Sequence, residues 1–185
     1  MPLQTVRRVL PHEYSKYRQH LKTLDPESRT LRFANPVSDL VIDQLCDRFE
    51  KDANKHILFA VENSQLEFIA IGHIALYEEM ELAFSVLKEY QGAGLGSALM
   101  KRCIQWCRAN NILKGCMVCL ASNKVIKYLC AKHGIKTSTE DGESLAKIEL
   151  DHPNIVTYVS EATDTNLGAL DYVGKRIISP WTFAV

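Results

Sequence analysis

Two patterns of apolar and polar residues alternate along the chain, and together they predict a single α+β domain. Short apolar runs and two-residue alternation indicate strands, whereas apolar residues three or four positions apart indicate helices. The expected strands are 3–10, 56–62, 66–77, 81–87, 114–120, 135–139 and 144–150, and the expected helices are 11–24, 39–52, 95–109, 122–133 and 154–172. No internal repeat or low-complexity segment interrupts this order.

The first third of the chain predicts an edge strand and two helices. Residues 3–10 resemble an edge strand with two exposed arginines, and 11–24 forms a helix with a proline in its first turn. The Asp-Pro-Glu sequence at 25–27 breaks that helix, and 28–36 is expected to be short and irregular before helix 39–52 begins. The inward residues are expected to be Tyr14, Tyr17 and Leu21 in the first helix and Leu40, Val41, Leu45 and Phe49 in the second.

The central feature is a buried strand, 81–87, followed by three glycines and a helix that begins at Leu95. Glycine permits a positive φ and lets the backbone approach a ligand closely. The first turn of a helix has unpaired N–H groups and a partial positive charge. Gly92, Gly94 and Gly96 therefore predict a site for phosphate or pyrophosphate. The alternative is a tight strand-to-helix turn without a ligand.

Two common phosphate loops do not fit this stretch. The dinucleotide fingerprint has a longer glycine spacing than Gly92 to Gly96, and it has an acidic residue about 20 positions later, where this chain has none. The P-loop ends in Gly-Lys-Ser/Thr, whereas Gly96 is followed by Ser97 and Ala98.

The sequence Gln91-Gly92-Ala93-Gly94-Leu95-Gly96 does resemble motif A of the GCN5-related N-acetyltransferase (GNAT) family. That resemblance implies a single GNAT-like domain over residues 1–152, with a mixed central sheet flanked by helices. It also implies acetyl-CoA as co-substrate, its pyrophosphate held by loop amides and its pantetheine oriented by the strand backbone. The residues implied to bind it are Phe84, Val86, Gln91, Gly92, Ala93, Gly94, Leu95, Gly96 and Ser97.

The family's motif B is matched by the segment from Asn123 to Gly134 and Ile135. In relatives this asparagine contacts the cofactor; the alternative here is a role in capping the helix. Many members place a tyrosine seven residues later as general acid, where this chain has Cys130. Tyr128 is two residues earlier, about 200° away around a helix. We interpret Cys130 as a packing residue, and which of the two assists the leaving thiolate stays open.

Glu81, at the start of the central strand, is the candidate general base. A lysine-type amine has a pKa near 10.4 and must lose a proton before it attacks a thioester. This glutamate resembles the catalytic one of bacterial Pat-type protein lysine acetyltransferases, and residues 25–33 are similar to a segment of theirs. The alternative is a solvated residue at a strand end, with Glu78 and Glu79 as weaker candidates.

Composition narrows the partners and the compartment. The chain of 185 residues has 22 Lys+Arg and 22 Asp+Glu, so its net charge of +0 argues against nucleic-acid binding. We expect no membrane span, no signal peptide and a cytoplasmic location. The six cysteines are expected to be buried packing residues, including those of Cys116-x-x-Cys119, and no metal is expected.

The remaining residues, 153–185, form an extension beyond the family's usual domain. We expect a helix from about Asn154 to Tyr172, ended by Gly174 and followed by an apolar segment, 177–183. The helix packs on the domain, forms a homodimer contact or lines the acceptor cleft, and the sequence leaves these three open.

The resemblance implies an acetyl-CoA-dependent N-acetyltransferase whose acceptor is a primary amine, either a protein lysine or a small molecule. The alternative from a different class is a non-catalytic acyl-CoA-binding regulator that kept the glycine loop. The sequence does not specify the acceptor, the acyl length or the oligomeric state.

Overall fold

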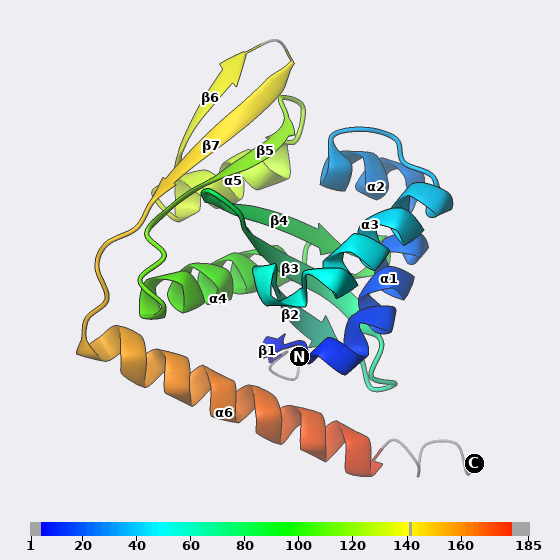
Figure 1. Ribbon diagram of the computed structural model, residues 1–185, viewed down its shortest axis with the longest axis vertical. Coiled ribbons are helices and arrows are strands. Elements are labelled where there is room, and N and C mark those ends of the chain that lie inside the picture. The colour runs from blue at the N-terminus through cyan, green and yellow to red at the C-terminus, as the bar shows by residue number, and fades with distance from the viewer. Residues whose placement is uncertain (1–4, 141, 179–185) are drawn as a thin grey trace.

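The computed structural model describes residues 5–140 and 142–178, which form a mixed seven-stranded sheet covered by helices (Figure 1). Across the sheet the order is β1-β2-β3-β4-β5-β7-β6, and neighbours are antiparallel except for β4 and β5. The strands are β1 Arg7–Arg8, β2 His56–Glu62, β3 Phe68–Leu76, β4 Met80–Val86, β5 Lys114–Leu120, β6 Lys136–Glu140 and β7 Glu143–Glu149. The helices are α1 Tyr14–Thr23, α2 Pro26–Phe33, α3 Asp39–Lys51, α4 Leu95–Ala109, α5 Lys124–Lys132 and α6 Ile155–Ile178. The predicted α+β class is confirmed.

The core lies on both faces of β2, β3 and β4, because helices cover each side. On one face the Ser85 hydroxyl and the buried His20 ring of α1 are 2.8 Å apart. On the other face α4 lies so close to β3 that a Cβ on Gly72 would be 2.9 Å from the Cys103 sulfur. Every residue of β2 is buried, as its apolar sequence predicts. None of the helices in the described ranges has the length and apolar character needed to cross a membrane.

The sheet opens between its fourth and fifth strands. In the described chain β4 and β5 pair only at Met80 with Gly115 and at Glu81 with Cys116, after which they diverge (Figure 1). The strands meet very closely at this junction, since a Cβ on Gly115 would lie 2.1 Å from Met80 Cγ. Because both strands continue beyond the junction, the carboxyl-terminal part of β4 faces an open fork rather than a neighbouring strand.

The prediction that residues 28–36 are irregular is wrong, because Pro26–Phe33 forms α2. Asp25 is the N-cap, and its carboxylate accepts hydrogen bonds from the amides of Glu27 and Ser28. Proline at the first helical position suits a helix start, so the Asp-Pro-Glu sequence ends one helix and begins another. Helix α2 contacts both β4 and β5, and so spans the fork.

The prediction of two exposed arginines on the first strand is wrong for Arg7, of which only 5% is exposed. Its guanidinium donates hydrogen bonds to the carboxylates of Glu13 and Glu62, which are also buried. A buried charge requires such partners, and both of them come from other elements. The described strand is also shorter than 3–10, and the start of that range lies outside the described residues.

Two helix predictions also need correction. In α3 the buried residues are Ile42 and Cys46, whereas Leu40 and Val41 are exposed, because the inward face is rotated relative to the predicted one. Helix α6 does not end at Gly174 but continues to Ile178, and most of the predicted apolar segment 177–183 lies outside the described residues. The predicted inward residues of α1 are confirmed.

The cysteine prediction holds for all but one of the six. Cys116 is half-buried, and the other five are buried and form no disulfide. Cys116 and Cys119 both lie on β5, where residues three positions apart point to opposite faces. The two thiols therefore do not converge on one metal.

Three buried histidines predict how stability depends on pH. Burial lowers the pKa of His20 to about 4, and burial also lowers the pKa of His56 and, more strongly, that of His73. The unfolded chain takes up protons near pH 6.5 while the folded chain does not, so the free energy of unfolding should fall as the pH drops from about 6.5 to about 4. Each histidine contributes up to about 1.4 kcal/mol per pH unit in that window. Urea unfolding at several pH values measures this, and His20→Gln should reduce the slope; equal slopes would contradict the prediction.

Candidate active site

The glycine loop between β4 and α4 has the conformation that an anion site requires. Gly92 and Gly94 have φ values of +78° and +82°, and Gly94 is the N-cap of α4. The first bond of the helix runs from the Ala98 amide to the Gly94 carbonyl at 3.1 Å, so the amides of the preceding turn are free of the helical ladder. A Cβ on either glycine would meet no atom within 4 Å. The loop thus has both the donors and the open space that a pyrophosphate needs.

The side chain of Gln91 holds this loop in place. Its Nε2 donates hydrogen bonds to the Val86 carbonyl and to the Ser28 hydroxyl, both at 3.1 Å. These bonds join the loop to the end of β4 and to the first turn of α2. Gly96 has a packing role, because a Cβ there would lie 3.1 Å from Leu129 of α5.

The fork connects the glycine loop to Glu81. Phe84 and Val86, the strand residues predicted to orient the cofactor, are half-buried and lie on the part of β4 that β5 no longer pairs. Glu81 is exposed and belongs to the last β4–β5 pair before the fork opens. From Glu81 to Val86 the strand rises about 17 Å. The predicted base and the predicted phosphate loop therefore lie at opposite ends of one open strand edge.

The surroundings of Glu81 include other ionisable groups. Its cross-strand neighbours are Ala75 on β3 and Cys116 on β5. Burial raises the pKa of the Cys116 thiol, and the nearby Glu81 and Glu79 raise it further. Cys116 therefore stays protonated at neutral pH and does not compete as a thiolate.

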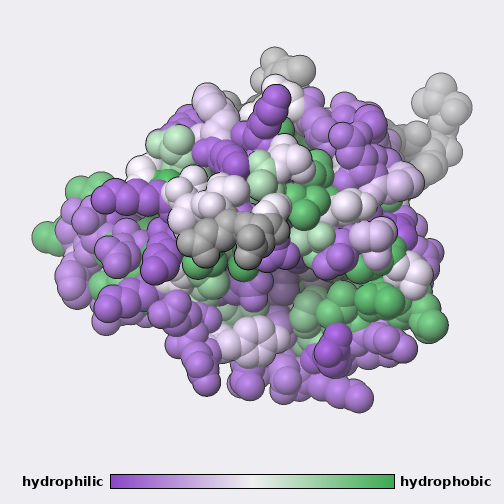
Figure 2. All heavy atoms as spheres, turned by 90° about the horizontal axis from the view of Figure 1, so that it is seen from above, coloured by the Kyte–Doolittle hydropathy of each residue, from purple (hydrophilic) through white to green (hydrophobic). Residues whose placement is uncertain are grey.

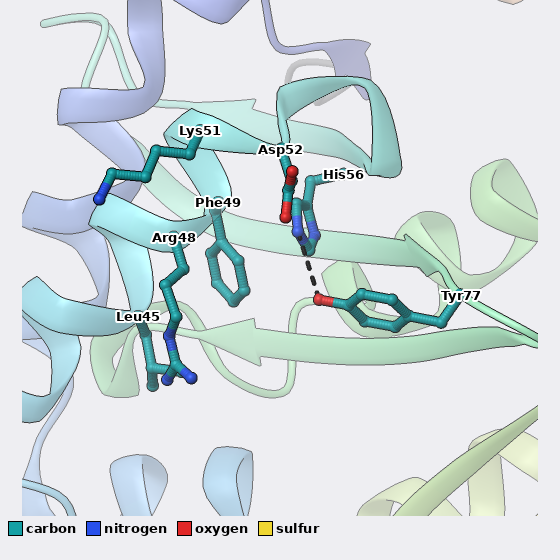
Figure 3. Close-up of a pocket in the computed structure, with 7 residues that line it drawn as sticks. All are labelled: Leu45, Arg48, Phe49, Lys51, Asp52, His56 and Tyr77. Carbon is teal, nitrogen blue, oxygen red and sulfur yellow. Dashed lines mark hydrogen bonds between the residues drawn. The ribbon is translucent and has the colours of Figure 1, made fainter.

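A chain of hydrogen bonds on the same face of the sheet was not predicted from the sequence. Nη2 of Arg32 lies 3.3 Å from Nδ1 of His73, and arginine can only donate, so this nitrogen accepts. Nε2 of His73 then carries the proton and donates to Nδ1 of His56 at 3.0 Å. Nε2 of His56 donates in turn to the Tyr77 hydroxyl oxygen at 3.4 Å (Figure 3). The hydrogen bonds therefore all donate in one direction, from Arg32 toward Tyr77, and both imidazole rings are neutral. The hydroxyl proton of Tyr77 is left to donate to another partner.

This chain borders a pocket of about 230 Å³ between α3 and Tyr77. In Figure 3 Asp52 lies beside His56, while the charged ends of Arg48 and Lys51 point away from that ring. The residues that line the pocket are Leu45, Arg48, Phe49, Lys51, Asp52, His56 and Tyr77.

The strand register relates this pocket to Glu81. His56 pairs with Ala75, and Ala75 pairs with Glu81, so the three side chains form a row on one face of β2, β3 and β4. Such a row spans about 10 Å, and its middle residue is small. The pocket and the carboxylate therefore open to the same side of the sheet. The register of β2 and β3 brings these histidines together, and a register shift between Val61 and Glu62 prevents it from being counted from the turn.

The residues predicted from motif B have local roles in the structure. Asn123 is the N-cap of α5, where the alternative interpretation placed it, and its side chain accepts from the Ile126 amide at 3.1 Å. The sequence also favours Ser122 as the N-cap of this helix, and that prediction is wrong, because Ser122 precedes the cap. Cys130 is fully buried, and burial raises the pKa of its thiol to about 11. Tyr128 is 65% exposed.

Comparison with known proteins gives consistent matches. The model of the acetyltransferase (GNAT) family matches residues 18–134. An acetyltransferase of Pseudomonas aeruginosa is 26% identical over 145 residues, which are 75% of this chain and 78% of that protein. The GNAT domain of S. lividans PAT has a TM-score of 0.66 and 22% identity, covering 78% of this chain and 89% of that one. The spermidine N-acetyltransferase of Vibrio cholerae, solved with CoA and spermine, has a TM-score of 0.59 and 16% identity. The match covers 78% of this chain and 92% of that one.

Proposed function

Because the chain belongs to the acetyltransferase (GNAT) family, we propose that it transfers the acetyl group of acetyl-CoA to a primary amine. The observation that carries this proposal is the open fork of the sheet, with a glycine loop at one end and an exposed carboxylate at the other. The acyltransferase part spans residues 1–152, and acetyl-CoA would supply the acetyl group as a thioester.

Residues of the loop and of β4 fit the co-substrate in different ways. The amides from Gly92 to Ser97 would bind the pyrophosphate, because Gly92 and Gly94 leave that side of the loop open. The backbone of Phe84 and Val86 would orient the pantetheine along the fork. Asn123 would contribute through its amide nitrogen, since its oxygen already caps α5.

We assign Glu81 as the general base. Its exposed carboxylate accepts a proton from the acceptor ammonium, directly or through water, and the free amine then attacks the acetyl carbon as the C–S bond breaks. The proton that the nitrogen loses as the amide forms goes to the departing CoA thiolate, which leaves as the thiol. Arg32 and the two neutral histidines keep Tyr77 in a fixed orientation beside the pocket, so the Tyr77 hydroxyl is positioned to face the amine.

The pocket supports an aliphatic amine with one positive charge as the acceptor. A volume of about 230 Å³ suits a lysine side chain better than a bulky ligand, because drug-sized pockets start near 300 Å³. Arg48 and Lys51 at the pocket would repel the further charges of a polyamine, and Asp52 offers one carboxylate. A protein lysine is therefore our first proposal, and a small monoamine is the alternative.

An acceptor screen tests this proposal. Release of free thiol from acetyl-CoA is followed with lysine peptides, small monoamines and polyamines. Turnover with lysine peptides or monoamines and little with spermidine is expected. Turnover only with polyamines would overturn the acceptor assignment. CoA binding without turnover on any amine would favour the non-catalytic regulator.

Cys130→Ala should change the rate by less than about tenfold, because the thiol is fully buried and its raised pKa makes it a poor proton donor. Single-turnover rates at pH 7 measure this, with Tyr128→Phe as the companion variant. A loss of 100-fold or more, the lower range for a general acid, would show that Cys130 is catalytic.

A further inference from the structure

Helix α6, the long helix at the bottom of Figure 1, carries apolar side chains on its outer face. Five of them form one stripe, and each is more than half exposed: Ile155, Val159, Leu170, Val173 and Ile177. Ala162 and Asn166 complete the stripe by helical spacing. By contrast, hydrophilic residues predominate on the opposite end of the molecule (Figure 2). A helix that packs on its own domain normally turns its apolar face inward.

Polar contacts explain why α6 has the reverse orientation. The buried Arg102 of α4 donates two hydrogen bonds to the carboxylate of Glu161. The ammonium group of Lys175 donates to the Glu62 carbonyl at 3.1 Å. Between them α6 lies directly on β1, since a Cβ on Gly168 would be 2.9 Å from Arg7 Cβ. These contacts determine the rotation of the helix and leave its apolar stripe outside.

The stripe is symmetric about its own centre. Its seven positions are spaced by 4, 3, 4, 4, 3 and 4 residues, and Asn166 is the middle one. If two α6 helices pair antiparallel about Asn166, isoleucine meets isoleucine and valine meets valine. The remaining pair joins the small Ala162 to the large Leu170, and the two Asn166 amides face each other. An amide both donates and accepts, so such a pair satisfies itself.

We propose that the chain forms a two-fold homodimer through antiparallel pairing of the α6 stripes. A two-fold interface requires a surface that is complementary to itself, which this stripe is. Together with the neighbouring Val156 and Leu167, the stripe exposes on the order of 800 Å², the amount that one partner contributes to an interface of standard size. The stripe contains no charged residue, so two copies do not repel each other.

A single buried asparagine is typical of paired helices, where it specifies register.

Sedimentation velocity of the full chain tests the proposal. We expect the mass of two 20.9 kDa chains, and Leu170→Glu should convert the dimer to a monomer, because the charge would lie against Ala162. Leu40→Glu is the matched control, since Leu40 is exposed on α3 and should leave the dimer intact. Circular dichroism checks that both variants fold. A native chain that is monomeric at micromolar concentration would overturn the proposal.

Cysteine cross-linking tests the orientation independently. Asn166→Cys places two thiols at the two-fold axis, so oxidation should give a covalent dimer well above the background of the native chain. Ile155→Cys places them at opposite ends of the pair and should not cross-link. Cross-linking of Ile155→Cys but not of Asn166→Cys would show that the antiparallel arrangement is wrong.

Discussion

Replacing Glu81 by glutamine is expected to lower kcat by about 10²–10⁴-fold at neutral pH, the usual contribution of a general base. Glutamine keeps the shape of the side chain but accepts no proton. Glu81 is exposed at the strand junction, so the fold should tolerate the change. Affinity for acetyl-CoA should change little, since the glycine loop follows the other end of β4, where Val86 is about 17 Å along the strand from Glu81.

The decisive measurement is the pH–rate profile of both proteins with one accepted amine. The loss of kcat in Glu81→Gln should become smaller as the pH approaches the amine pKa near 10.4, because free amine then forms without a general base. Glu149→Gln is the matched control, as Glu149 is an exposed carboxylate on β7 that should leave the profile unchanged. Parallel profiles for native protein and Glu81→Gln between about pH 6 and pH 10 would exclude Glu81 as the base.

The sequence was sufficient where structure depends on local pattern. The glycine loop was predicted because Gly92 and Gly94 need a positive φ, which few other residues adopt. Strands β2 and β5 match their predicted bounds, since loop residues on either side mark where each apolar run begins and ends. The fork itself required the structure, because a pattern of residues along β4 does not show where a neighbouring strand departs.

Features that depend on distant partners were missed or misread. Arg7 is buried because Glu62, on a different strand, offers it a carboxylate. His56 and His73 meet only through the register of β2 and β3. The rotation of α6 follows from Arg102 and Glu161, a pair 59 residues apart that overrides the apolar pattern of the helix. In each case contacts between segments far apart in the sequence determined the arrangement, and the local pattern does not show them.

Replacing Gly94 by aspartate should abolish binding of CoA, with a loss of at least about 100-fold in affinity. The carboxylate would enter the open side of the loop, where it repels a pyrophosphate and accepts hydrogen bonds from the free amides of the first helical turn. The fold should survive, because a Cβ on Gly94 meets no atom within 4 Å and a left-handed residue costs only about 1–2 kcal/mol. Isothermal titration with CoA measures the affinity.

Two control variants separate the effect of charge in Gly94→Asp from the effect of backbone strain. Gly142 has a φ of +84° and is equally open, so Gly142→Asp imposes the same strain on the hairpin between β6 and β7, far from the loop along the chain. Its affinity for CoA should equal that of the native chain. Gly94→Ala adds the same Cβ without charge and should lose much less than Gly94→Asp. If folded Gly94→Asp binds CoA as tightly as the native protein does, the phosphates are held elsewhere and the glycine loop is only a turn.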